Sequence, residues 1–380
     1  MTIFVLIIAL AFAMVVTPLV RQLALHLNFV AAPRRDRLHR AATPLMGGVA
    51  VYISLIGALV LLAILLTVAD TLDLDQTFTM SELLAVIASG TALAAAGLWD
   101  DWVDLNSKLK LALQFIPVVL LTTVGGISTH MPVPPLVNQL ISICWFLYVI
   151  NAFNYTDNMD GIAGMIATVA GMFFTVIALL NDQVLLAALA AAVAGTSFGF
   201  LRFNLFHERE KIFMGDVGSM FLGFLLAVIG LKLSFPAASP LVTWPVPVLV
   251  LGVPIFDTAL VFVSRWRRRQ PFLWGGTDHL SHRLARMDLG RYGTPFAIGL
   301  LGSAMGCLAL IVMETDLPNS LAAQSLAAVC GLYLLYRLEL AAPYHFITGR
   351  SEPTQEQQPG DIEVQTTTMA AKAEESTPAL

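Results

Sequence analysis

The sequence contains few charged residues for its length. Only 12% of its 380 residues are charged, against roughly 25% in soluble domains, whereas 57% are hydrophobic and the mean hydropathy is +0.77. The net charge of −5 says little by itself, because the positions of the lysines and arginines orient a membrane protein. No nucleic-acid partner is expected. This composition excludes an ordinary soluble domain and predicts a polytopic membrane protein.

Cysteine is also rare. The three cysteines, Cys144, Cys307 and Cys330, all lie in apolar runs, so we expect them to pack as small hydrophobic residues rather than to form disulfides or bind metal. The sequence has no Walker loop, no dinucleotide-binding fingerprint and no repeat of fixed period. It therefore lacks the signatures of the common nucleotide-binding and repeat architectures.

Long hydrophobic runs make up most of the chain. They predict an all-α fold of eleven transmembrane helices, each long enough to cross a hydrocarbon core of about 30 Å at about 1.5 Å per residue. Pro117 and Pro254 are expected to kink the helices that contain them. The predicted spans are 2–20, 45–68, 81–98, 111–127, 138–153, 161–180, 184–201, 217–235, 243–264, 294–313 and 320–340.

The basic residues predict the orientation of these spans. Of the 21 lysines and arginines, only Lys232 lies outside five segments that alternate regularly with the predicted spans. The positive-inside rule places these segments in the cytoplasm, with the N-terminus outside and the C-terminus inside. The five segments are 21–40, 99–110, 202–216, 265–293 and the stretch from 337 onward.

The chain is predicted to form one membrane domain followed by a tail. No basic segment precedes the first span and no cleavage site is evident, so the span is expected to remain uncleaved. Residues 1–345 are predicted to form an integral membrane domain with cytoplasmic loops. Residues 346–380 are predicted to be a disordered cytoplasmic tail, because Glu, Gln, Thr, Ser and Pro dominate from residue 351 onward.

Four polar clusters interrupt the apolar sequence, and the predicted topology places all of them at the cytoplasmic surface. Carboxylates gathered with histidine and arginine suit a divalent cation and a phosphate-bearing substrate, which predicts phosphoryl transfer. An ion-coupled transporter is the alternative from another class, but it would need polar groups at several depths. The clusters are Asp100–Asp101, Asn154–Asp160, Asp216 and His279–Arg283.

The first cluster is a pair of adjacent acids at the end of a span. Asp100 and Asp101 repel each other, and keeping both ionised beside a low-dielectric region requires a cation or a shifted pKa. A metal site or a general base would explain the pair, and a solvated helix end is the alternative. Lys108 and Lys110 could pair with these acids or hold an anionic phosphate.

The second cluster has helical spacing. Asn151, Asn154, Asp157 and Asp160 follow one another at intervals of three, so on a helix they project toward one side. Ionisable residues inside a membrane cost about 2.5–3.5 kcal/mol each on insertion scales, which favours a functional role. The alternative is an interfacial stripe that caps the next helix.

The third cluster opens a predicted span. Asp216 lies between Gly215 and Gly218, where a ligand can approach the backbone closely and the helix N-terminus favours anions. An acid here would bind a metal that bridges to phosphate. Phe213 could stack on a base, although a core position is commoner for phenylalanine.

The fourth cluster follows a basic run. His279, His282 and Arg283 come after a Gly-Gly pair, and the glutamate of a His-Glu-x-x-His metalloprotease motif is absent. Because arginine binds phosphate through a two-pronged fork, the cluster predicts a diphosphate clamp rather than zinc hydrolysis. The preceding run of arginines by itself indicates only topology and attraction to anionic lipid.

Together these motifs resemble the polyprenyl-phosphate N-acetylhexosamine-1-phosphate transferase superfamily, also called the glycosyltransferase 4 family, over roughly residues 1–340. An Asp-Asp pair, an Asn-x-x-Asn-x-x-Asp-x-x-Asp-Gly signature, a Phe-Met-Gly-Asp-x-Gly-Ser element and a late histidine loop occur in the family's order. His39 and the segment Thr43–Gly48 match the family's first cytoplasmic loop.

The resemblance implies a Mg²⁺-dependent reaction of a UDP-N-acetylhexosamine with polyprenyl phosphate in the bilayer, for which Mn²⁺ could replace Mg²⁺. It also implies a protein of the bacterial inner membrane whose active site faces the cytoplasm. It implies Asp216 and Asp101 as metal residues, and leaves open which of Asp100 and Asp101 acts as a base and whether the protein is a homodimer. The implied catalytic residues are Asp100, Asp101, Asp157, Asp160 and Asp216, and the implied substrate-binding residues are Lys108, Asn151, Asn154, Asn204, Phe213, His279, His282 and Arg283.

Within this superfamily, the sequence favours transfer of GlcNAc-1-phosphate from UDP-GlcNAc to undecaprenyl phosphate, for synthesis of a cell-envelope glycan. The late loop, Asp278 to Arg283, is closer to the amino-sugar branch than to the triple-histidine run of the muramoyl-pentapeptide branch. Asn158 replaces a glycine that is usual in the family, and asparagine also tolerates left-handed geometry. The alternative is a phospho-N-acetylmuramoyl-pentapeptide transferase of peptidoglycan synthesis.

Overall fold

The computed structural model describes residues 1–31, 43–68, 77–129, 131–206, 211–236, 238–271 and 276–341. The chain divides into two compact units, residues 1–336 and residues 337–380, and of the second only the end of one helix is described. The predicted tail of residues 346–380, His39 of the first loop and Gly275 of the Gly-Gly pair lie outside the described residues.

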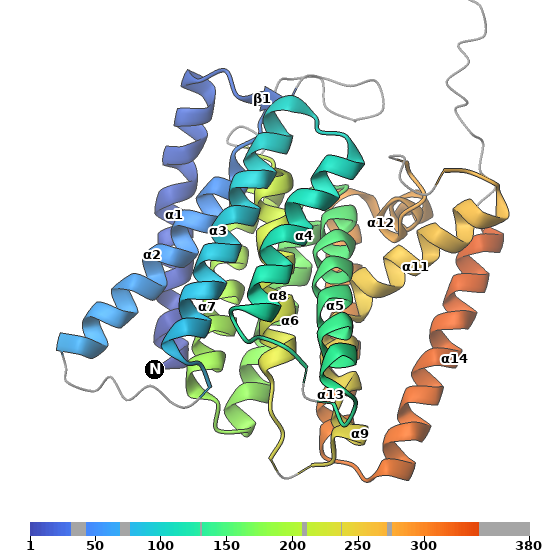
Figure 1. Cartoon of the computed structure of the whole chain (residues 1–380). Coiled ribbons are helices and arrows are strands. Elements are labelled where there is room, and N and C mark those ends of the chain that lie inside the picture. Colours follow the sequence, from blue (N-terminus) through green and yellow to red (C-terminus); the bar gives the residue numbers. More distant parts are fainter. Residues whose placement is uncertain are drawn as a thin grey trace, which may run out of the picture. The chain divides into compact units, whose positions relative to one another are not determined.

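The described chain is almost entirely helical, which confirms the all-α prediction (Figure 1). Two short antiparallel strands, β1 (Val30–Ala31) and β2 (Thr43–Pro44), are the exception in this part of the chain. The helices are α1 (Thr2–His26), α2 (Gly47–Val68), α3 (Met80–Val103), α4 (Ser107–Thr123), α5 (Pro135–Thr156), α6 (Ile162–Leu180), α7 (Val184–Leu201), the π-helical turn η1 (Arg202–Phe206), α8 (Gly215–Lys232), α9 (Pro240–Thr243), α10 (Pro245–Val250), α11 (Gly252–Arg267), α12 (Leu280–Leu284), the π-helical turn η2 (Ala285–Leu289), α13 (Gly290–Met313) and α14 (Leu317–Ala341).

The helices are long and apolar enough for a multi-pass membrane protein. Within the described ranges nine helical segments could cross a membrane by length and composition, or ten if the bent pair of α9–α10 and α11 counts as one span. The predicted number of eleven is therefore not confirmed. The difference lies in α4, which has 17 residues and carries two lysines in its first turn.

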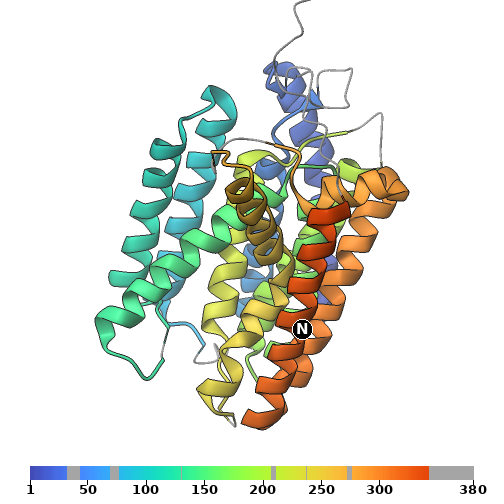
Figure 2. The same ribbon diagram turned by 90° about the vertical axis from the view of Figure 1, so that its right-hand side faces the viewer.

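Helix α8 lies at the centre of the bundle formed by residues 1–336 (Figures 1 and 2). It is apolar on all sides and 14 of its 18 residues are buried, as expected for a helix surrounded by other helices. Its neighbours include α2, α3 and α5. The start of α8, which carries Asp216, is thereby brought next to the polar ends of α3 and α5.

Glycines allow the backbones to approach closely at the start of α8. A Cβ atom on Gly48 of α2 would lie 2.0 Å from the Gly218 nitrogen, and one on Gly97 of α3 would lie 2.6 Å from the Val217 nitrogen. Gly48 also donates a backbone hydrogen bond of 2.6 Å to the Met214 carbonyl. Small residues at these crossings, as in membrane helix pairs generally, fix the distance between α3 and α8.

One predicted span is broken rather than kinked. The helical segment Pro240–Val250 and α11 meet at an angle of 74°, with the break at Leu251. Pro254, at which a kink was predicted, instead lies in the first turn of α11, where proline's missing N–H has no helical partner to lose.

Candidate functional site

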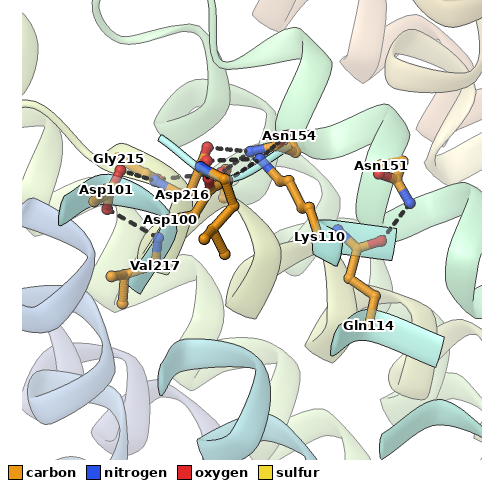
Figure 3. Close-up of polar contacts among 11 residues, drawn as sticks. Asp100, Asp101, Lys110, Gln114, Asn151, Asn154, Gly215, Asp216 and Val217 are labelled. Carbon is orange, nitrogen blue, oxygen red and sulfur yellow. Dashed lines mark hydrogen bonds and ion pairs between the residues drawn. The ribbon is translucent and has the colours of Figure 1, made fainter. Parts of the chain in front are cut away.

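Four polar side chains from four helices meet at one end of the bundle (Figure 3). Lys110 of α4 lies between the carboxylates of Asp100 (α3) and Asp216 (α8), with its Nζ atom 2.8 Å and 2.6 Å from their Oδ2 atoms. Lys110 also donates to Asn154 Oδ1 of α5 at 3.0 Å. We refer to Asp100, Lys110, Asn154 and Asp216 as the Asp–Lys cluster.

Asn154 fixes the orientation of Asp216. Its Nδ2 atom donates to Asp216 Oδ1 at 2.6 Å and to Ser219 Oγ at 2.8 Å, so the amide is held by three partners that include Lys110. The side chain of Asp216 is 29% exposed, whereas that of Asp100 is only 6% exposed. Asp216 is thus the acid of the cluster that a solute can approach.

Asp101 has a different role from its neighbour. Its carboxylate accepts backbone hydrogen bonds from Asp216 at 2.9 Å and from Val217 at 3.3 Å, at the start of α8. Gly215, with φ of +70°, makes this approach sterically feasible, because a Cβ there would lie 2.5 Å from Asp101 Oδ2. Both oxygens of Asp101 cap α8, so its predicted part in metal binding stays a prediction.

The cluster is compatible with a magnesium ion that takes most of its ligands from a substrate. Among the described residues no group of three His, Cys, Asp or Glu side chains could hold a metal ion. Mg²⁺, however, usually binds through one or two carboxylates together with phosphate oxygens and water. Asp216 supplies carboxylate oxygens and is more exposed than Asp100, so it is the acid of the cluster that is available to join a phosphate-bound ion.

A second set of contacts surrounds Asp160. This acid pairs with Lys211, and Arg291 Nε lies 3.7 Å from the same oxygen. The ammonium of Lys211 lies 5.0 Å from the centre of the Phe213 ring. Asp157 is half-buried at the C-terminal end of α5. These predicted residues lie in one region, and the structure gives Asp160 two cationic neighbours that the sequence did not single out.

Three residues that were predicted to bind substrate have other contacts or positions in the structure. Asn204 is buried and bridges the Gly161 nitrogen, at 2.6 Å, and the Ile212 carbonyl, at 2.9 Å. Asn151 donates to Gln114 Oε1 at 2.6 Å (Figure 3). Lys108 is exposed and lies outside the Asp–Lys cluster, where Lys110 takes the position between the acids.

The late histidine segment, residues 278–283, is anchored to α11. His279 Nδ1 lies 2.8 Å from Asp257 Oδ2, and its ring centre lies 6.5 Å from that of half-buried His282. Arg283 is buried and donates to the Asp278 carbonyl at 2.7 Å and to Ser264 Oγ at 2.7 Å. These contacts give Arg283 a part in holding the segment, whereas its predicted contact with diphosphate stays a prediction.

The histidine segment also contacts the end of α5. Ser281 Oγ donates to Asn158 Oδ1, next to Asp157 and Asp160. The fourth polar cluster of the sequence therefore lies beside the second, and the first and third meet in the Asp–Lys cluster. The convergence that the predicted topology required is present in the structure.

Comparison with known proteins gives a family match over the same region. Residues 83–234 match the model of glycosyl transferase family 4. This stretch extends from the first turn of α3 to just beyond α8 and contains all four residues of the Asp–Lys cluster.

Three relatives illustrate the similarity along the chain. A decaprenyl-phosphate N-acetylglucosaminephosphotransferase of Mycolicibacterium smegmatis is 34% identical over 302 residues, which cover 70% of this chain and 71% of the relative. A probable undecaprenyl-phosphate N-acetylglucosaminyl 1-phosphate transferase of Bacillus subtilis is 27% identical over 323 residues, 83% of this chain and 86% of the relative. A phospho-N-acetylmuramoyl-pentapeptide-transferase of Bacillus cytotoxicus is 27% identical over 246 residues, 60% and 72% respectively.

Proposed function

The chain belongs to glycosyl transferase family 4, and on this premise we propose that it transfers GlcNAc-1-phosphate from UDP-GlcNAc to a polyprenyl phosphate. An oxygen of the lipid phosphate attacks the β-phosphorus of the sugar nucleotide. The bond from this phosphorus to the bridging oxygen breaks, so UMP leaves and polyprenyl-diphospho-GlcNAc forms. The names of the Mycolicibacterium and Bacillus subtilis relatives support this substrate pair.

The Asp–Lys cluster is the observation that carries the proposal. Lys110 presents an ammonium at the end of the bundle, between the carboxylates of Asp100 and Asp216. This ammonium attracts the phosphates of the two substrates and opposes their mutual repulsion. Asn154 and Asp100 hold Lys110 in place, so the cation does not have to be ordered when substrate binds.

Asp216 is the residue proposed to hold Mg²⁺. A bound Mg²⁺ would neutralise charge on the phosphates and align them for in-line displacement. The proposal predicts that EDTA stops UMP release and that added Mg²⁺ restores it, with Mn²⁺ as a partial substitute. Full turnover by protein stripped of divalent cations would contradict it.

The sugar donor can be tested by release of UMP from the purified protein in the presence of undecaprenyl phosphate. With UDP-GlcNAc we expect turnover, and with UDP-N-acetylmuramoyl-pentapeptide we expect none above background. The similarity to the muramoyl-pentapeptide transferase makes that donor the second candidate. Turnover with the pentapeptide donor alone would replace the GlcNAc assignment and leave the reaction class unchanged.

A further inference from the structure

Asp257 is a buried acid for which the Asp–Lys cluster provides no role. It lies on α11 with 1% of its surface exposed, and both of its oxygens accept hydrogen bonds from the histidine segment. His279 Nδ1 lies 2.8 Å from Oδ2, and the Leu280 backbone nitrogen lies 2.6 Å from Oδ1. An acid in an apolar helix is costly unless it is hydrogen-bonded, and these two bonds satisfy it.

The contact defines how the His279 ring is held. Because a carboxylate only accepts hydrogen bonds, the proton of this contact belongs to Nδ1, and the neutral ring then has an unprotonated Nε2. Leu280 begins α12, so one acid fixes both the ring and the backbone next to it. Rotation of the ring would break the hydrogen bond between His279 Nδ1 and Asp257 Oδ2.

The neighbouring ion pairs hold the segment without contacting the ring. Asp278 accepts from Arg265 Nε at 3.0 Å and from Arg268 at 3.3 Å, both on α11. Arg283 Nε donates to the Asp278 carbonyl at 2.7 Å. These contacts anchor the segment at Asp278 and Arg283 independently of Asp257, which adds the hydrogen bond from the Leu280 nitrogen and the contact with the His279 ring.

We propose that Asp257 is a positioning residue that keeps Nδ1 of His279 protonated, so that Nε2 accepts a hydrogen bond from a hydroxyl or amide N–H of the donor sugar. The inference rests on the proposed function, because it assigns a contact to the sugar nucleotide of that reaction. It changes the role expected for His279, since an unprotonated Nε2 cannot donate to a diphosphate oxygen. His279 would then bind the sugar, and the cationic groups would bind the charged phosphates.

The first test is the protonation state of His279, read by ¹⁵N NMR of histidine-labelled full-length protein at the pH of the activity assay. The chain has seven histidines, and the His279 signals are identified by their loss in His279→Ala. We expect a protonated Nδ1 and an unprotonated Nε2. A proton on Nε2, with or without one on Nδ1, would overturn the proposal, and this result does not depend on whether the donor is UDP-GlcNAc.

The second test is Asp257→Asn, which keeps the size of the side chain but offers an N–H to Nδ1, so the ring proton is expected to move to Nε2. We expect kcat/KM for UDP-GlcNAc to fall about 10- to 100-fold, the range seen when the partner that orients a metal-bound histidine is removed, with KM for the lipid unchanged. In the His279→Ala background the same substitution should have no further effect. An equal loss in both backgrounds would show a merely structural role and sink the proposal.

The matched control is Thr258→Val. Thr258 is the next residue on α11, is buried, and donates only to the Pro254 carbonyl of its own helix at 2.9 Å. This variant should retain wild-type kcat/KM. If wild-type protein releases no UMP from UDP-GlcNAc, the proposed function fails, whereas active wild-type protein with an equally active Asp257→Asn variant refutes only the role of Asp257.

Discussion

At the scale of single residues, the identity of the cation between the acids decides how the site works. Lys110 contacts Asp100, Asn154 and Asp216, whereas Lys108 is exposed. Residues two apart on a helix face different directions, so only one of the two lysines can point into the bundle. Nothing in the local sequence shows which one does, because that depends on how α4 is rotated against α5 and α8.

Substitutions of the two lysines form a matched pair, which compares the lysine between the acids with the exposed one. Lys110→Ala leaves two carboxylates facing each other without a cation, and we expect UMP release to fall about 100-fold or more, the scale on which removal of a positioned charge acts. Lys110→Arg keeps the charge and should lose less. Lys108→Ala should remain near wild type, and the reverse order of effects would show that Lys108 holds the phosphate.

The hydrogen bonds of Asp101 lead to a separate prediction about stability. Its two hydrogen bonds cap the start of α8, so Asp101→Ala should lower the free energy of unfolding by about 0.5–2 kcal/mol, the usual effect of losing a helix cap. Thermal unfolding in detergent would measure this, with the exposed acid Glu314→Ala as control. An unchanged melting temperature for Asp101→Ala would show that the cap contributes little and would favour the metal-binding role.

The candidate site shows what the sequence could predict and what it could not. Spacing and charge identified Asp100, Asn154 and Asp216, because polar groups at the ends of apolar spans stand out against their surroundings. Arg283 and Asn204 were also predicted to bind substrate, yet in the structure both make hydrogen bonds within the protein. Side chains that bind a ligand and side chains that hold a loop have the same chemistry, and only their partners distinguish them.

At the scale of elements, the site depends on how closely α3 approaches the start of α8. The sequence shows Gly97 and Gly218 but not that they lie at a helix crossing. Hydropathy likewise missed the break at Leu251, because the apolar composition continues through it. It placed a span at 111–127, whereas α4 begins at Ser107 with two lysines in its first turn. Long apolar segments are thus predictable, while their ends and breaks are set by packing.

Gly97→Ala tests the close approach. The new Cβ would lie 2.6 Å from the Val217 nitrogen and 2.7 Å from the Asp216 carbonyl oxygen, so α3 must move away from α8. Overpacking of this kind costs about 1–3 kcal/mol, and the movement would separate Asp100 from Asp216 and lower turnover. Differential scanning fluorimetry and UMP release would report both effects.

Gly331→Ala is the control for this substitution. Gly331 also lies within a helix, α14, but a Cβ there meets no described atom within 4 Å. Its stability should stay the same or rise slightly, because alanine favours a helix over glycine. Equal destabilisation by the two variants would mean that the α3–α8 contact is not tight.

At the scale of the whole molecule, the proposed reaction requires the functional site to face the cytoplasm, where sugar nucleotides are available. The basic residues predict this orientation, with the N-terminus outside. Hydropathy predicts that the chain crosses the membrane many times, and the helices agree.

Thiol labelling would establish the orientation. In a variant without the three native cysteines, Lys108→Cys introduces a thiol at the end that carries the Asp–Lys cluster, and Glu314→Cys introduces one at the far end of α13. An impermeant maleimide added to intact spheroplasts should label only the thiol at position 314, and lysis should expose the thiol at position 108. The opposite pattern would place the site outside.

Transfer of radiolabel from [β-³²P]UDP-GlcNAc into polyprenyl lipid, by wild-type protein and by Asp216→Asn, tests the central claim most directly. Asparagine keeps the size of the side chain and its hydrogen bond from Lys110, but lacks the charge proposed to hold Mg²⁺. We expect label in the lipid extract with wild-type protein and a loss of at least about 100-fold in the variant at an unchanged melting temperature. Wild-type transfer by Asp216→Asn would contradict a reaction centre at the Asp–Lys cluster.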